Sequence, residues 1–93
     1  MDYPKIVEMV PPDKWAPLSE ELIGVILGAK NDDKIPNNIA NTILMDMKTG
    51  KSSTKQGLTL LMEVAVVSDP EKTIIALGDM QLLKAAAEII QGA

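Results

Sequence analysis

The chain is 93 residues long, 46% of its residues are hydrophobic, and its formal net charge at pH 7 is −4. This length suits one domain over residues 1–93, and the apolar fraction excludes a disordered chain. Cysteine and histidine are absent and every basic residue is a lysine, which excludes disulfides, removes the commonest general base and metal ligand, and disfavours nucleic-acid binding.

The N-terminal segment is predicted to form one or two helical turns at residues 6–10. These turns end at Pro11 and Pro12, because the residue before a proline is disfavoured in the helical region. Residues 13–17 are expected to form a connector, with Trp15 covering one end of the core.

Two full helices are predicted next. The first covers residues 18–30, with Ser19 as its N-cap and Asn31 to Asp33 as its end. The second covers residues 36–47, because Pro36 suits the first helical position and apolar residues recur at helical spacing after it. Gly50 is a natural stop for the second helix.

The second half of the chain is more apolar. A third helix, the most buried one, is predicted over residues 53–67, with a narrow polar stripe at Lys55, Thr59 and Glu63. Residues 80–91 show an amphipathic helical pattern that breaks near Gly78 and Asp79. Either a helix beginning at residues 69–71 kinks there, or residues 73–77 belong to a separate element.

These elements predict an all-α bundle of four to five helices. The alternative is an α+β fold in which residues 42–77 form a three-stranded antiparallel meander flanked by helices. Turn residues at 48–51 and 68–71 could close its hairpins, so the sequence leaves helix and strand open for residues 58–77.

No string of residues completes a catalytic, cofactor or metal motif. Gly50-Lys51-Ser52 is the end of a P-loop pattern, but Met45 stands where its first glycine is needed. Residues 31–33 lack the spacing of a calcium loop. We therefore expect no cofactor, no metal and no catalytic residue.

Three features remain as candidate sites. Gly24 and Gly28 lie four residues apart on an apolar helix, where they would let another backbone approach closely. We expect that close packing within the chain, with a contact between chains as the alternative. Lys48, Lys51 and Lys55 surround a turn between two helices, which in a DNA-binding helix-turn-helix protein would contact the major groove.

The third feature is Glu63, which stands in the most apolar helix. A buried carboxylate there would have a raised pKa and could serve a small apolar-ligand-binding protein or an enzyme.

The functional hypothesis is a non-catalytic protein–protein interaction module or a small subunit of a larger assembly, a homo-oligomer or part of a hetero-complex. A chain this small has a thin stability margin, which oligomerisation often widens. A DNA-binding regulator and a protein with a buried carboxylate are the alternatives. We expect no membrane span, because the longest nearly apolar run, residues 58–67, is about half the length needed, and we expect a cytoplasmic location.

Overall fold

The computed structural model describes residues 1–29 and 35–92. Its regular elements are α1 (Tyr3–Glu8), a 3-10 turn (Pro12–Lys14), α2 (Trp15–Gly28), α3 (Ile35–Lys48), α4 (Thr54–Ser68), α5 (Pro70–Asp79) and α6 (Leu83–Gly92). The all-α prediction is confirmed, with six α-helices in this part of the chain instead of four to five. The alternative meander at residues 42–77 is wrong, because that region forms α4, α5 and the end of α3.

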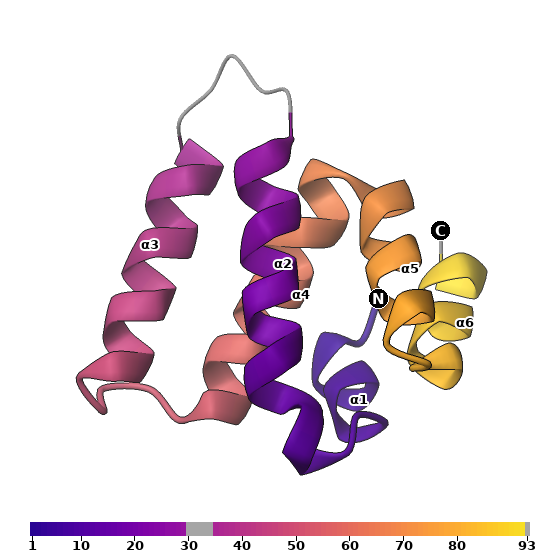
Figure 1. Cartoon of the computed structure of the whole chain (residues 1–93), viewed down its shortest axis with the longest axis horizontal. Helices are drawn as coiled ribbons and strands as arrows, with labels where there is room; N and C mark the ends of the chain where they lie inside the picture. Colours follow the sequence, from indigo (N-terminus) through magenta and orange to yellow (C-terminus); the bar gives the residue numbers. More distant parts are fainter. Residues whose placement is uncertain (30–34, 93) are drawn as a thin grey trace.

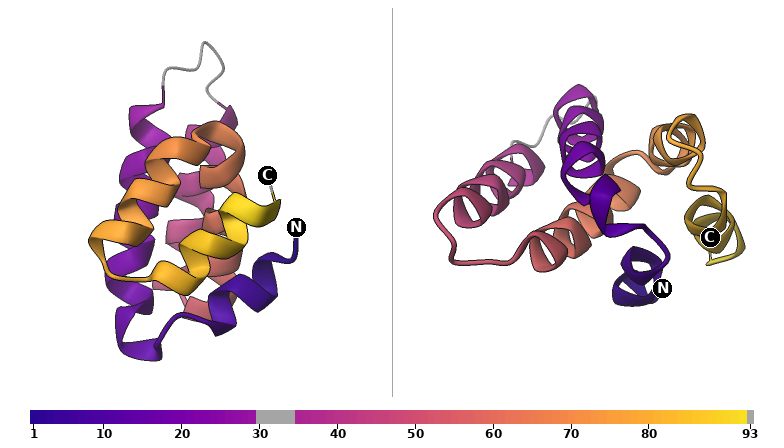
Figure 2. Two further views of the ribbon diagram at one scale, coloured as in Figure 1. Left: turned by 90° about the vertical axis from the view of Figure 1, so that its right-hand side faces the viewer. Right: turned by 60° about the horizontal axis from the view of Figure 1, so that its bottom comes forward.

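Among the six described helices, α4 is the central one. Helices α2 and α3 run antiparallel beside each other, and α4 lies behind α2 (Figure 1). α4 contacts α1, α2, α3 and α5, while α6 packs on α5 and α1. The two ends of the chain lie side by side (Figure 2), with the Met1 side chain beside Gly92.

The core is built from aliphatic side chains and one methionine, Met62. Among the described residues no aromatic side chain belongs to it, although Tyr3 and Trp15 pack against it. The indole nitrogen of Trp15 donates a hydrogen bond to the Val10 carbonyl at 3.0 Å, and the half-buried indole packs against the core. The buried hydrophobic residues are Ile6, Val7, Val10, Leu18, Leu22, Val25, Ile26, Ala40, Ile43, Leu58, Leu61, Met62, Ala65, Ala76, Leu77, Leu82, Ala85, Ala86 and Ile89.

The start of α4 is fixed by a capping box. The Ser53 hydroxyl accepts a hydrogen bond from the backbone N–H of Gln56, and the Gln56 side chain accepts one from the backbone N–H of Ser53. This reciprocal pair satisfies two N–H groups that a helix start otherwise leaves free. The predicted third helix, residues 53–67, is thereby confirmed within one residue at each end.

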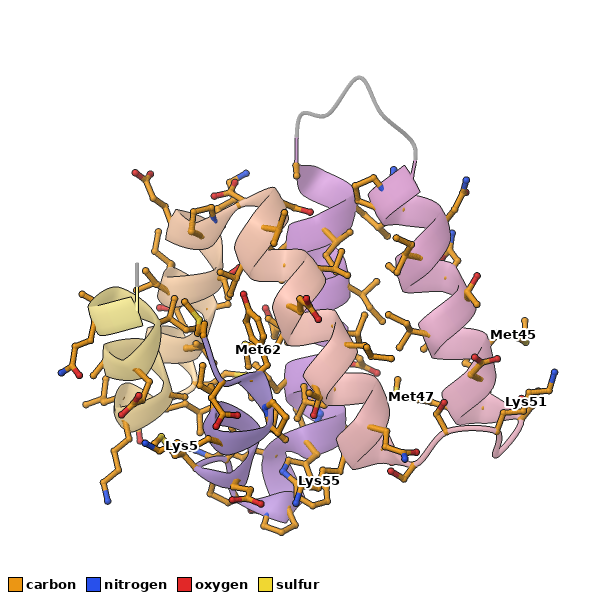
Figure 3. The ribbon with its side chains drawn as sticks, turned by 180° about the vertical axis from the view of Figure 1, so that it is seen from behind. Lys5, Met45, Met47, Lys51, Lys55 and Met62 are labelled. Carbon is orange, nitrogen blue, oxygen red and sulfur yellow. The ribbon has the colours of Figure 1, made fainter. Side chains whose placement is uncertain are left out.

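Close packing of α3 on α4 depends on Gly57. A Cβ atom placed at Gly57 would overlap Sδ and Cγ of Met47, which lies between the two helices (Figure 3). Met45, two residues earlier, is exposed on the outer side of α3. The one glycine of α4 therefore leaves the space that the Met47 side chain occupies.

One predicted boundary is corrected, and a second lies outside the described residues. Ser19 is not an N-cap, because α2 begins at Trp15 and Ser19 is buried inside the helix. Pro17 does not prevent this early start, since the N–H groups of a helix's first turn have no partner within the helix in any case. The expected helix end at Asn31–Asp33 lies outside the described residues.

The break in the C-terminal pattern is real and falls after Asp79. α5 ends there, Gln81 adopts a positive φ of 61°, and the Lys14 side chain donates a hydrogen bond to the Met80 carbonyl at 2.9 Å. The break therefore separates two helices. On α6, Leu83 and Ile90 are exposed, whereas Ala85, Ala86 and Ile89 are buried in the core.

Candidate functional site

Only two polar side chains in the described part of the chain are buried, and their own helices satisfy both. The Ser19 hydroxyl donates to the Trp15 carbonyl and the Thr73 hydroxyl to the Asp69 carbonyl, each at 2.8 Å. No cluster of three or more possible metal ligands occurs among these residues. The candidate site therefore lies on the surface, which offers exposed apolar side chains and charged groups.

One face of α4 stays uncovered although other helices pack around the rest of it. Gln56, Leu60, Glu63 and Val67 are all exposed, and their spacing of four, three and four residues aligns them along the helix. We call these four residues the α4 stripe. Leu60 is 47% exposed and Val67 is 77% exposed. The helix with the most neighbours thus presents two aliphatic side chains to solvent.

Two shallow grooves, both open to solvent, flank the stripe and meet at Leu60. The α3–α4 groove is lined by Asn38, Ile39, Thr42, Ile43, Asp46 and Leu60. The α1–α4 groove is lined by Pro4, Lys51, Ser52, Lys55, Gln56, Thr59 and Leu60. Because Leu60 borders both, the apolar surface continues from α3 across α4 to the start of α1.

Two charged groups lie on the α1 side of Leu60: Lys55, which precedes Leu60 in the chain, and Glu63, the stripe residue that follows it. The Lys55 ammonium lies 3.4 Å from a carboxylate oxygen of Glu8 in α1. Burial, and after it the negative charge of nearby Glu63, raises the pKa of Tyr3, which also belongs to α1. The surface therefore has a positive charge toward the beginning of α4 and a negative charge toward its end.

Glu63 is exposed, so the hypothesis of a buried carboxylate is wrong at this residue. The physical reason is helical geometry: Glu63 follows Leu60 by three residues and precedes Val67 by four, on the face that no other helix covers.

The predicted lysine cluster lies at the α3–α4 end of the molecule. Lys48 and Lys51 are exposed, and Lys55 is half-buried and paired with Glu8. Lys51 and Lys55 both line the α1–α4 groove, whereas Lys48 borders a different groove, between α2 and α3. Two of the three lysines therefore border the same groove.

The glycine pair on α2 is not packed against any other part of the chain that the structure describes. Gly24 and Gly28 are exposed, and among residues 1–29 and 35–92 nothing lies within 4 Å of a Cβ atom placed on either. The expectation of close packing is therefore wrong for the described residues, and the alternative of a contact between chains stays a prediction.

Gly24 instead lines a groove between α2 and α5, which we call the acidic groove. Its aliphatic wall includes Ile75, which is 60% exposed. The residues that line the acidic groove are Glu20, Glu21, Gly24, Val25, Lys72, Ile75, Ala76 and Asp79. Three carboxylates against one lysine give this groove a negative charge, whereas two lysines and no carboxylate line the α1–α4 groove.

The sequence prediction missed Leu60 and Val67, because nearly all apolar residues of this helix were assigned to its buried side. Their spacing from Glu63 was the available signal. A helix that exposes a glutamate also exposes its neighbours three and four residues away, and here those neighbours are apolar.

No protein-family model matches the chain, and no curated protein or solved structure is detectably similar to it. No described helix combines the length and apolar character needed to cross a membrane.

Proposed function

We propose that this chain is a non-catalytic protein-binding module, working as a subunit of a larger assembly, and that its partner docks on the α4 stripe and the grooves beside it. The observation that supports the proposal most directly is the exposure of Leu60 and Val67 on the central helix. The cytoplasm is the proposed compartment, because a cysteine-free chain needs no oxidising environment to fold.

The composition of this surface supports the proposal. Protein interfaces commonly combine an apolar centre with a polar rim, and here Leu60 is surrounded by threonine, asparagine, serine and glutamine side chains and two lysines. α4 is also held by four other helices. A surface fixed in this way loses little conformational entropy when a partner binds.

The DNA-binding alternative has less support from the same surface. A recognition helix presents polar and basic side chains to base edges and phosphates. The α4 stripe presents Leu60, Glu63 and Val67 instead, and the chain as a whole is acidic.

The proposal is tested by affinity capture from cells at low and moderate salt, reading both protein and nucleic acid. We expect a stoichiometric protein that survives moderate salt, is lost with Leu60→Asp, and is retained with Ile75→Asp. Ile75 is the matched control, because it is an exposed aliphatic residue in the middle of a helix on the acidic groove. Circular dichroism of both variants verifies that the fold is intact.

Two results would contradict the proposal. Capture that is insensitive to Leu60→Asp would remove the α4 stripe as the docking site. Recovery of nucleic acid that is lost with rising salt and with Lys51→Glu combined with Lys55→Glu would favour the DNA-binding alternative.

A further inference from the structure

The charges of Lys55 and Glu63 are arranged so that the surface complements itself. Lys55 contacts Glu8 of α1, and Glu63 lies near Tyr3 of α1, so both lie on the α1 side of Leu60. Lys55 precedes Leu60 by five residues and Glu63 follows it by three. At about 1.5 Å of rise per residue, they stand about 7.5 Å and 4.5 Å from Leu60 along the helix, in opposite directions.

We infer that the occupant of the α4 stripe is a second copy of this chain, with the two α4 helices antiparallel and the two Leu60 side chains meeting at a two-fold axis. This inference rests on the proposed function and names its partner. The two-fold axis of this dimer lies in the plane of contact and is perpendicular to α4. Rotation about it reverses the direction of α4, while the α1 side of one copy stays next to the α1 side of the other. Lys55 of each copy therefore faces Glu63 of the other, on the α1 side of both.

The offset between the paired groups suits a long lysine side chain. In the antiparallel arrangement, Lys55 and the other copy's Glu63 differ by about 3 Å along the helix direction. Val67, about 10.5 Å beyond Leu60, points toward the Ser52 end of the other copy's α1–α4 groove. Val67 is 77% exposed in the single chain, and this contact covers it.

A stable dimer interface is larger than the α4 stripe, so the contact must extend beyond these four residues. A stable interface buries about 800 Å² on each partner, and the accessible surface of one chain is 5642 Å². About one seventh of the surface must therefore be covered, more than four side chains supply. The flanking grooves, with Ile39 on α3 and Pro4 on α1, must take part as well.

A parallel two-fold arrangement would use different charges. It would place Lys55 on the α3 side of the other copy, where Asp46 lines the α3–α4 groove. The antiparallel arrangement also sets opposite ends of the two α4 dipoles beside each other, which is the favourable orientation. Asp46 and Glu63 therefore distinguish the two arrangements experimentally.

Sedimentation velocity on the full chain across micromolar concentrations tests the inference. We expect a monomer–dimer equilibrium. Leu60→Asp should weaken it at least about thirtyfold, as loss of a central interface residue does. Ile75→Asp should leave it unchanged. Far-UV circular dichroism and thermal unfolding of each variant verify the fold.

The charge-swap experiment tests the orientation. Glu63→Lys and Lys55→Glu should each weaken the dimer about tenfold, because each replaces two attractive contacts by like-charge contacts. The double variant should restore the wild-type dissociation constant. Asp46→Lys should leave it unchanged; weakening by Asp46→Lys that Lys55→Glu reverses would overturn the antiparallel arrangement.

A wild-type chain that stays monomeric over the whole concentration range would overturn the inference. The proposed function would still stand if cellular capture of a different protein depended on Leu60. If capture were also insensitive to Leu60→Asp, both would fail.

Discussion

The α4 stripe and the acidic groove are both shallow surfaces with an exposed aliphatic side chain, yet they differ in construction. The stripe lies on the central helix, beside a tightly packed contact in which Gly57 accommodates Met47. The acidic groove lies between α2 and α5, and no described residue lies within 4 Å of a Cβ atom placed at its glycine, Gly24. Glycine thus occurs at a filled contact beside the α4 stripe and at an open position in the acidic groove.

The charges of the two regions differ as well. Lysines border the α1–α4 groove, while carboxylates dominate the acidic groove. This contrast shows that the net charge of a chain is a poor guide to the charge of a binding surface. The chain is acidic overall, but the surface proposed for docking has a lysine before Leu60 and a glutamate after it.

The largest expected effect is the difference in stability between a variant of the core and a variant of the proposed binding surface. Leu58 is fully buried, and Leu60, two residues later, is half-exposed. We expect Leu58→Ala to lower the free energy of unfolding by about 2–5 kcal/mol, through lost burial and a residual cavity. Leu60→Ala and Ile75→Ala should each change it by less than about 0.5 kcal/mol. Denaturant unfolding at low protein concentration gives all three values, and a loss above 2 kcal/mol for Leu60→Ala would show that the stripe belongs to the core.

The second effect concerns the filled contact at Gly57. Gly57→Ala should lower the free energy of unfolding by about 1–2 kcal/mol, because overpacking against Met47 exceeds the gain in helix propensity. In a Met47→Ala background the same change should become neutral or stabilising, since the obstructing side chain is gone. A double-mutant cycle measures this coupling. Equal effects in both backgrounds would mean that Met47 is not what Gly57 accommodates.

At the open position, Gly24, the expected change in the free energy of unfolding has the opposite sign. Gly24→Ala should raise the free energy of unfolding by about 0.5–1 kcal/mol, because Gly24 lies inside α2 and an added methyl group meets no neighbour. Gly78→Ala on α5 is a second open position and serves as the matched control. Both are measured by thermal unfolding. Destabilisation by Gly24→Ala alone would indicate that α2 is covered in solution.

The smallest effect tests the local geometry of the stripe. Glu63→Gln should lower the pKa of Tyr3 toward its ordinary value of 10.0, because a nearby negative charge is removed, while the contribution of burial remains. Tyr3 is the only tyrosine, so ultraviolet absorbance of tyrosinate reports it directly. Since folding raises this pKa, the associated stability is present at neutral pH and is lost as the pH rises through the folded-state pKa. An unchanged titration would place Glu63 away from α1.

The sequence predicted the helices well where several local signals agreed. α3 combined a proline in its first turn, helical periodicity and a glycine stop, and the structure has Gly50 at a positive φ of 80°. The β-branched residues near Val66 allowed a strand as an alternative to a helix in this segment. In the structure the segment is a helix that packs against four others. Sequence reasoning placed the start of α2 too late, because Ser19 has the chemistry of a cap and its burial depends on the tertiary structure.

The surface was harder to predict than the fold. Leu60 and Leu58 are the same residue type two positions apart, and only their direction around α4 makes one a core residue and the other a surface residue. Gly24 and Gly28 had the spacing of a packing interface, but whether another helix lies over them depends on contacts between segments far apart in the chain. Such contacts leave no local signal.

The most direct test of the central claim is photo-crosslinking in living cells, with a benzophenone amino acid placed at Leu60 in one variant and at Ile75 in another. We expect a discrete protein adduct from position 60, whose mass shows whether the partner is a second copy, and none from position 75. Adducts from position 75 alone, or from neither position, would contradict the assignment of the α4 stripe as the docking surface.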